Sequence, residues 1–481
     1  MATTDNLTDF LTGVADAIRA KKSTTALINP QNFASEIASI SGGGGGEEPQ
    51  PEGTHKVTFM DVDGTILKTE YVEEGGSATA PANPTREKCE FVKWLNAYTN
   101  ITKDTDVFAL YKSADGNTWY RVKAAANDRM SLSIRCDSTS PVTIDWGDGA
   151  TDTATNTSSY TVFRHDYASA FDGWVKVSSE GGYRPSTPDE GNPCVKEVIV
   201  GDNVGTVGSV AREMTNLTAI VIPETVAAYE GRPFRHCVSL VSLALPDGVT
   251  TISTDTASAM IGLRYVRLPA TFTSLPQSLL SYCSSLQSVE IPSGVTSIGS
   301  SAFQNCYIAV LSVNPDNFAP SSATFQYCRR LTGPLNLQRT DAIPYDAFSY
   351  TGITSLYAKT LKLTRTANGG AFCYCTELTR VELPDITDMG THAFNNCTAL
   401  TLAIIGEDIT NIGSRTFYNC SALERLVVKA PTPPTLTSDA LQGCSALQGI
   451  YVPDDSVETY KAATNWVAYA DKILPLSEFT E

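Results

Sequence analysis

The residues best suited to metal or redox chemistry are twelve cysteines and four histidines. Zinc sites are usually marked by paired C-x-x-C or by H-E-x-x-H spacing, and neither pattern occurs here. Cys373 and Cys375 are too close together for a zinc knuckle. The histidines fall in different parts of the chain: His55, His165, His236 and His392. We therefore expect no metal site and no cofactor.

Most of the cysteines recur at one position of a longer period, the first position of a C-x-x-L pattern. Its occupants, 22 to 24 residues apart, are Met214, Cys237, Met260, Cys283, Cys306, Cys328, Thr351, Cys375, Cys397, Cys420 and Cys444. Neighbours in such a register lie one strand apart with parallel Cβ vectors, a geometry that strains a disulfide. Because Met and Thr substitute for Cys without disturbing the period, we predict a buried column of free thiols.

The segment FMDVDGTIL, Phe59 to Leu67, holds two closely spaced carboxylates. It resembles the D-x-D-G-T motif of haloacid-dehalogenase-type phosphotransferases. That resemblance implies Asp61 as nucleophile and Asp63 as acid/base beside magnesium. The same chemistry needs a downstream Lys, further acidic residues and a Rossmann-like sheet, but no alternating βαβ pattern follows. We favour a turn, and a phosphatase remains a remote alternative.

Asp145, Asp148 and Asp152 surround the sequence Trp146-Gly147-Asp148-Gly149. Carboxylates at this spacing could bind calcium. Aspartate and glycine are also the residues that a tight turn requires. We favour the turn, and the sequence leaves calcium binding open.

Composition and charge narrow the classes of function. The 481 residues carry a formal net charge of −17, which argues against nucleic acid and anionic membrane surfaces as partners. The sequence contains no run of 18 apolar residues, so we predict no membrane span. Asp5, Asp9 and Asp16 interrupt the N-terminus, so no secretory signal is expected. This favours synthesis in the cytoplasm and release by another route, such as assembly into a virus particle.

Residues 1–41 are predicted to form a helical attachment or oligomerisation segment. Helices are expected over Asn6 to Ala20 and from about Pro30 to Ile40, and such a small pair would need a partner or trimerisation. The stretch LTDFLTGVADAIRAKKSTTALINPQNFASEIASI resembles an N-terminal module of phage tail and fibre proteins. The resemblance implies a virion location, contacts with other virion proteins and a homotrimer. A Gly/Pro linker is predicted over residues 42–54.

Two β-rich modules are predicted next. Residues 55–112, with the D-x-D-G turn, Gly75-Gly76 and Trp94, resemble the Listeria–Bacteroides (internalin B-type) repeat, which implies a small β-grasp spacer of surface proteins. Residues 117–180, with the W-G-D-G turn, His165 and Tyr167, resemble the polycystic-kidney-disease type of immunoglobulin-like sandwich. A second linker is predicted over residues 181–193, which are rich in Gly, Pro and Ser.

Residues 194–453 form a repeat array. Prolines recur 23 residues apart from Pro223 to Pro315, and a further register holds Phe234, Leu280, Phe303, Phe325, Phe348, Phe372, Phe394, Phe417 and Leu441. The unit A-F-x-x-C-x-x-L-x-x-[VIL]-x-[LI]-P resembles the BspA-type leucine-rich repeat. We expect one short strand per unit, such as Leu286 to Ile291, with stacked units sharing a core. Residues 454–481, with an amphipathic helix after Pro453, are predicted to cap the open end.

The expected fold class is therefore a multi-domain, mainly β chain with a leucine-rich-repeat solenoid. Residues that alternate with core positions should line the strand face and are the candidate ligand contacts: Tyr265, Arg267, Glu290, Arg380, Glu382, Arg425 and Tyr451. We expect a non-enzymatic protein that binds host-surface protein or glycan. A fibre or receptor-binding adhesin on a bacteriophage tail or capsid is the first hypothesis. A bacterial cell-surface adhesin of the BspA/internalin type is the alternative.

Overall fold

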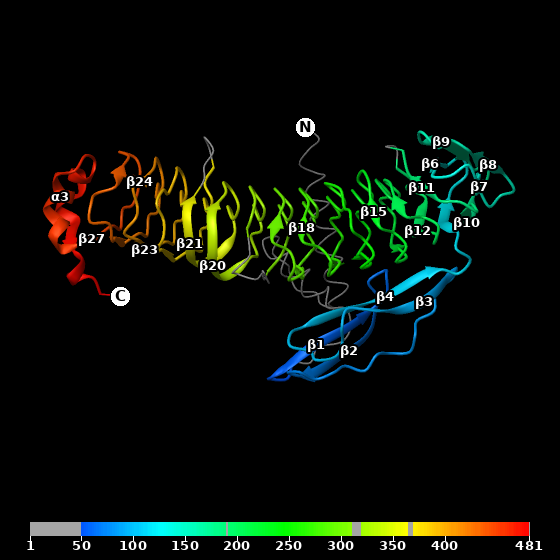
Figure 1. The fold of residues 1–481 in the computed structure, drawn as a ribbon, viewed down its shortest axis with the longest axis horizontal. Coiled ribbons are helices and arrows are strands. Elements are labelled where there is room, and N and C mark those ends of the chain that lie inside the picture. The colour runs from blue at the N-terminus through cyan, green and yellow to red at the C-terminus, as the bar shows by residue number, and fades with distance from the viewer. Residues whose placement is uncertain (1–49, 189–190, 310–318, 364–368, 481) are drawn as a thin grey trace, which may run out of the picture. The chain divides into compact units, whose positions relative to one another are not determined.

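The computed structural model describes residues 50–188, 191–309, 319–363 and 369–480 (Figure 1). The chain divides into two compact units. The described part of the smaller unit comprises residues 50–57, 70–79 and 98–105, and the larger comprises residues 58–69, 80–97 and those from 106 onward. The predicted N-terminal helices and most of the 42–54 linker lie outside the described residues.

In the smaller unit, Gly76 and Ile101 form an isolated bridge. The Gly75 N–H donates to the Ile101 carbonyl at 2.7 Å, and Ile101 itself is buried. His55 Nε2 lies 2.5 Å from Glu74 Oε2. These contacts are local to the unit.

The first module contributes a four-stranded sheet in the order β2-β1-β4-β3. Its strands are β1 (Thr54–Met60), β2 (Ile66–Glu73), β3 (Cys89–Leu95) and β4 (Thr105–Ser113). Within the larger unit, β4 is buried on both faces. Ala109 and Tyr111 pack with Ile199 of the repeat array, and Phe108 packs with Tyr265. The continuous apolar run of β4 follows from this two-sided burial.

The second module has two facing sheets. Three strands form one sheet in the order β11-β6-β9, and six form the other in the order β14-β12-β5-β10-β7-β8. The strands are β5 (Thr118–Ala124), β6 (Arg129–Cys136), β7 (Val142–Asp145), β8 (Thr151–Ala154), β9 (Thr161–Asp166), β10 (Phe171–Ser178), β11 (Tyr183–Ser186), β12 (Val195–Ile199) and β14 (Ala219–Val221). The buried rings of Trp146, Tyr167 and Tyr183 belong to the core.

The predicted linker over 181–193 is partly wrong, because it contains strand β11, which pairs with β6. The reason is Tyr183, whose side chain is fully buried. Its hydroxyl donates to the Val177 carbonyl at 3.1 Å and lies 2.7 Å from the Thr118 hydroxyl oxygen. Glycine and proline near this residue mark the ends of a short strand rather than a free connection.

The second module and the repeat array share one sheet. Strand β12 pairs antiparallel with β5 on one side and parallel with β14 of the next repeat on the other. The first edge of the array is thereby covered by the larger sheet of the module. An unpaired edge of this kind would otherwise be open to association with other chains.

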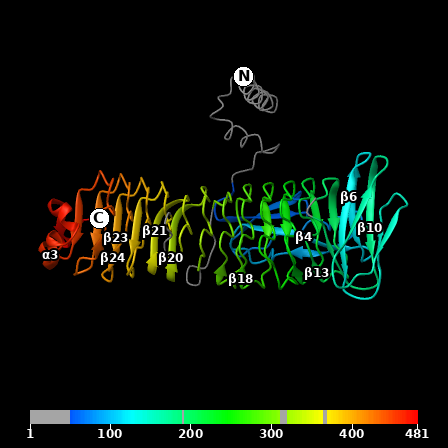
Figure 2. The ribbon, with the colours of Figure 1, turned by 90° about the horizontal axis from the view of Figure 1, so that it is seen from above.

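The repeats form a parallel solenoid, and successive turns follow one another along the array (Figures 1 and 2). One side carries β16 (Ser242–Ala244), β17 (Tyr265–Arg267), β20 (Thr332–Ile343), β21 (Gly352–Leu363), β22 (Arg380–Leu383), β23 (Leu402–Ile405), β25 (Arg425–Val428) and β27 (Gly449–Val452). Two-residue strands form a second set: β13 (Thr206–Val207), β15 (Ala228–Tyr229), β18 (Ser274–Leu275), β19 (Ser297–Ile298), β24 (Asn411–Ile412) and β26 (Thr435–Leu436). These findings confirm a mainly β chain with a repetitive parallel solenoid.

The strand predicted over Leu286 to Ile291 is not continuous. Leu286 and Val289 are buried as predicted, but within that segment only Glu290 forms a bridge. The burial pattern was therefore correct at these two positions and the hydrogen-bonded strand was not.

Two side-chain columns fill the solenoid. The phenyl rings of Phe303, Phe325, Phe348, Phe372, Phe394 and Phe417 stack with centroid separations of 5.4 to 5.6 Å. The register cysteines are buried and all twelve cysteines are free, which confirms the predicted thiol column. Each thiol of the register also has a hydrogen-bond partner that the sequence did not indicate. Cys397 Sγ donates to the Phe372 carbonyl at 3.2 Å and Cys420 Sγ to the Phe394 carbonyl at 3.1 Å, one repeat back.

The C-terminal segment closes the last repeat. It contains η2 (Asp454–Ser456), α3 (Val457–Ala462), η3 (Trp466–Lys472), β28 (Ile473–Pro475) and η4 (Leu476–Glu478), and β28 extends the parallel sheet beside β27. The helix predicted after Pro453 is α3. Trp466 is buried, and its indole N–H donates to the Pro434 carbonyl at 2.9 Å. Across the described ranges, no helix has the length and apolar character needed to cross a membrane.

Candidate binding sites of the solenoid

The strand face places the predicted ligand contacts in three different surroundings. Arg267 is buried: its guanidinium donates to Asn96 Oδ1 and the Leu245 carbonyl, both at 2.7 Å, and pairs with Asp247. Tyr265 packs against Phe108 and neighbouring apolar side chains. These contacts leave Arg267 buried and Tyr265 half-buried, so both side chains pack within the larger unit.

At the C-terminal end, the strand face is covered by the last residues of the chain. Arg425 Nη1 donates to the Thr480 carbonyl at 2.9 Å, and the Tyr451 ring lies 5.1 Å from the Phe479 ring. Because the covering segment lies about 30 to 55 residues further along the sequence, the repeat pattern alone could not show this. Arg425 and Tyr451 thus contact the C-terminal segment that covers the last repeats.

Between these covered regions, Glu290, Arg380 and Glu382 keep at least part of their surface accessible. Arg380 Nη2 lies 3.2 Å from Glu382 Oε2, and both side chains are about one third exposed. Glu290 is exposed. These three residues remain candidate ligand contacts of the strand face.

A different surface is built by the residue that directly precedes the Cys register, which we call the αL position of each repeat. Its φ angle lies between 57° and 63° at Glu213, His236, Ala259, Tyr282, Asn305, Tyr327, Tyr350, Tyr374, Asn396 and Asn419. Its N–H donates to a carbonyl of the following repeat, as from Tyr350 to Cys373 at 3.0 Å. The backbone conformation is left-handed because it aims this N–H along the array, and the side chain is left at the surface.

Aromatic αL residues stack on one another. The rings of Tyr327, Tyr350 and Tyr374 lie 4.5 Å apart at each step, and Tyr374 is 39% exposed. Partial burial, together with the flanking tyrosines, raises the pKa of Tyr350 to about 12. One ring per repeat therefore forms a ladder along this surface.

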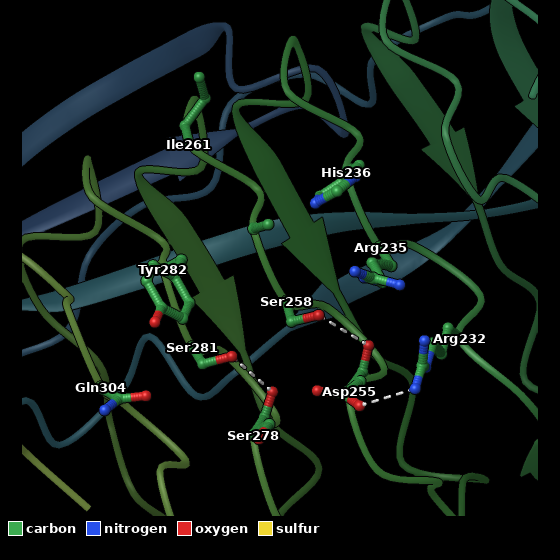
Figure 3. Close-up of a pocket in the computed structure, with 11 residues that line it drawn as sticks. Arg232, Arg235, His236, Asp255, Ser258, Ile261, Ser278, Ser281, Tyr282 and Gln304 are labelled. Carbon is green, nitrogen blue, oxygen red and sulfur yellow. Dashed lines mark hydrogen bonds and ion pairs between the residues drawn. The ribbon is translucent and has the colours of Figure 1, made fainter. Parts of the chain in front are cut away.

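The stacked rings end at Asn305, and the αL positions before it hold Tyr282, Ala259 and His236. A groove of about 500 Å³ lies over Ala259. Tyr282 and His236, one repeat to either side, stand on opposite sides of the groove, as Figure 3 shows. The methyl group of Ala259 leaves the middle position empty of a ring. Tyr282 is 53% exposed and Ile261 is 51% exposed, so two apolar groups face solvent beside this opening.

The groove is lined by neutral polar groups, by basic side chains and by one carboxylate, that of Asp255. Ser258, Ser278, Ser281 and Gln304 supply hydroxyl and amide groups, and both Ser258 and Ser281 donate to backbone carbonyls at 3.3 Å. The serine oxygens therefore retain lone pairs that can accept further hydrogen bonds.

Three basic residues lie on one side of the groove. Arg232 Nη2 is 3.5 Å from Asp255 Oδ2, and His236 Nδ1 is 2.8 Å from Glu213 Oε2. The Arg235 guanidinium has no ion pair or side-chain hydrogen bond to the described part of the chain. Arg235 is thus the residue best placed to receive an anion. The sequence analysis did not identify the residues of the groove, although the sequence shows which residues occupy the αL positions.

The aspartates of the first motif form a turn beside an ion pair network. Arg86 Nη1 lies 3.2 Å from Asp61 Oδ2 and 3.5 Å from Asp63 Oδ2, and Arg86 Nε lies 2.6 Å from Glu197 Oε1. Burial raises the pKa of the Glu197 carboxyl, and Arg86 opposes this shift. The described residues from β1 through β5 are connected without a helix. A Rossmann-like phosphotransferase sheet is therefore not what surrounds Asp61.

The aspartates of the second motif are committed to a hairpin between β7 and β8. Asp145 Oδ1 accepts from the Gly147 N–H at 2.9 Å, and Asp152 Oδ2 accepts from the Trp146 indole at 2.9 Å. Asp148 Oδ2 lies 2.8 Å from His165 Nε2. In the part of the chain that is described, no three His, Cys, Asp or Glu side chains group as metal ligands would. The partners of these carboxylates support the turn interpretation.

Comparison with known proteins identifies the repeats. Residues 205–332 and 341–464 match the BspA type leucine rich repeat region, in six copies, and the matched residues exceed half of the chain. The chain belongs to this family of leucine-rich-repeat proteins. No curated protein matches it.

Three solved structures show partial likeness. A leucine-rich repeat protein from Bacteroides ovatus is 20% identical over 59% of this chain and 84% of its own, with a TM-score of 0.41. A leucine rich cell surface protein from Faecalibacterium prausnitzii is 20% identical over 57% and 84%, with a TM-score of 0.35. A leucine-rich repeat protein from Eubacterium ventriosum is 16% identical over 58% and 91%, with a TM-score of 0.27. Likeness this weak tells nothing about ligand or location.

Proposed function

We propose that this chain is a non-enzymatic binding protein whose solenoid holds its ligand. The groove over Ala259 carries the proposal. It joins an exposed tyrosine, several hydroxyl groups and Arg235, which has no ion pair among the described residues, in one concave surface. Concave sites with a few converging polar groups are where ligands bind most often. The buried thiols and the paired aspartates have structural partners instead.

The setting that fits best is the surface of a bacterium, where the chain acts as an adhesin. Membership of the BspA-type repeat family favours it over the other settings, and so does the likeness of residues 55–112 to a spacer module of surface proteins. The solenoid would then present its groove to protein or glycan on a host surface. The net charge of −17 suits an exposed, soluble surface.

The second setting is a bacteriophage particle, with the chain as a tail or capsid fibre. The resemblance of residues 1–41 to a phage fibre module favours it. In this setting the N-terminal segment contacts other virion proteins and the chain forms a homotrimer. Peptide mass spectrometry of purified particles and of the wall fraction of uninfected cells separates the two. Detection in only one of them decides the setting.

Binding is tested with the labelled full chain on mucin-coated plates, cultured host cells and intact bacterial cells. Saturable binding of the chain to any of these surfaces supports the proposal, and the surface that binds the chain identifies the kind of target. The substitutions Arg380→Ala and Glu382→Ala report on the strand face, and Arg235→Gln reports on the groove. Failure to bind all three surfaces would contradict a binding role.

A further inference from the structure

We propose that the groove over Ala259 binds one pyranose ring that carries a carboxylate, such as the acidic unit of a host glycan. The inference rests on the proposed binding function and names the class of its ligand. Its starting point is the aromatic ladder. Where consecutive αL positions hold tyrosine, rings stack at 4.5 Å per repeat.

The absence of an aromatic ring at Ala259 sets the width of the groove. Tyr282 and His236 occupy the αL positions two repeats apart, so their rings are separated by about 9–10 Å at the usual strand spacing. A ring placed midway has each face about 4.5–5 Å from an aromatic neighbour, which is ordinary stacking distance. The groove therefore has the width for one ring over the Ala259 methyl group. Figure 3 shows Tyr282 and His236 on its two sides.

The lining distinguishes a sugar from an aromatic side chain of a protein. Hot spots for aromatic side chains are dry and apolar. Here the groove is bordered by Ser258, Ser278, Ser281 and Gln304, which match a ring carrying several hydroxyl groups. The exposed faces of Tyr282 and Ile261 supply the apolar contact that the C–H face of a pyranose can use.

The charges indicate a single carboxylate. Arg235 has no anionic partner within the described chain. Arg232 forms an ion pair with Asp255, with Nη2 3.5 Å from Oδ2. A guanidinium receives a carboxylate through two parallel hydrogen bonds. The formal net charge of −17 opposes the binding of a long polyanion, so a sulfated polymer is disfavoured. A single acidic sugar agrees both with the guanidinium of Arg235, unpaired within the described residues, and with the negative net charge of the chain.

The test is isothermal titration calorimetry of the full chain with four probes. Two are acidic, 3′-sialyllactose and hyaluronan tetrasaccharide, and two are neutral, lactose and chitotriose. We expect at least one acidic probe to bind, and both neutral probes to bind at least about tenfold more weakly. Arg235→Gln should weaken the acidic probe about ten- to a hundredfold, whereas Arg329→Gln, at an exposed arginine away from the groove, should leave it unchanged.

The sharpest variant is Ala259→Tyr, which supplies the missing ring. The φ angle of Ala259 is 57°, close to the 62° of Tyr282, so the backbone already suits tyrosine. We expect this variant to fold and to abolish binding. Asn396→Tyr is its matched control, because it adds a ring at the same αL position beyond Tyr374 and should leave binding intact.

Three outcomes overturn the inference. They are no binding of either acidic probe, equal binding of neutral and acidic probes, or unchanged binding in Ala259→Tyr. Retention on host surfaces separates this failure from failure of the binding function. If Ala259→Tyr stops adherence while no probe binds, the groove takes a protein side chain and the sugar assignment is wrong. If the chain adheres nowhere, the binding function itself is wrong.

Discussion

Replacing Phe394 by alanine removes one ring from the middle of the phenylalanine column. Phe394 is fully buried and stacks on Phe372 at 5.5 Å and on Phe417 at 5.6 Å. Truncation of a buried phenylalanine costs about 3–5 kcal/mol, and loss of two ring contacts adds to this. The cavity also separates two repeats that stabilise each other only through their shared core. We expect a loss of about 4–5 kcal/mol in the free energy of unfolding.

The matched control is Tyr374→Ala. Tyr374 stacks on Tyr350 at 4.5 Å in the same solenoid, but it is 39% exposed. Its truncation should therefore cost less than about 1.5 kcal/mol. Both variants are measured by urea denaturation, followed by far-ultraviolet circular dichroism and by tryptophan fluorescence. Trp466 reports on the C-terminal end of the array, where it is buried. Equal losses in the two variants would refute the argument that the ring column stabilises the repeats.

Three further predictions concern other parts of the chain. Arg267→Ala leaves the Leu245 carbonyl without its guanidinium donor and should lower the free energy of unfolding in urea by about 2–3 kcal/mol. The control Arg380→Ala should lower it by less than about 1 kcal/mol. Similar losses in the two variants would contradict the structural role of Arg267. Gly147 has φ +83° and a Cβ there would lie 2.6 Å from the Trp174 carbonyl oxygen, so Gly147→Ala should lower the melting temperature more than Gly149→Ala, where nothing lies within 4 Å; the reverse order would count against the hairpin geometry. Burial raises the pKa of thiols in the column, to about 12 at Cys328, so the folded chain keeps protons that the unfolded chain releases above its ordinary value of 9.0. Stability should therefore fall as pH rises from about 9 toward 12, by about 1.4 kcal/mol per thiol per pH unit, and a urea midpoint that stays constant from pH 8 to 10 would contradict this.

The periodic part of the fold could be predicted from the sequence, because the same burial is imposed on every repeat. The cysteine and phenylalanine registers identified the two core columns directly. What the thiols bond to could not be predicted, since the acceptor is a backbone carbonyl one repeat away. The linker prediction failed at Tyr183 because its buried hydroxyl has partners in two other strands.

The candidate site was predicted less well. The strand-face residues were chosen by alternation, which fixes the direction of a side chain but not what covers it. Arg267 is covered by the first module, and Arg425 and Tyr451 are covered by the C-terminal segment. The groove was missed because it arises from a small residue, Ala259, between two ring-bearing neighbours. An interruption of this kind becomes visible only when the αL position is recognised as a register of its own.

The central claim is that the solenoid binds its ligand in the slot between Tyr282 and His236. A crystal structure of the full chain soaked with 3′-sialyllactose tests it most directly. We predict a sugar ring over the Ala259 methyl group, with its carboxylate in hydrogen-bonding contact with Arg235. A ring bound instead on the strand face beside Arg380 and Glu382, with the slot empty, would contradict the account.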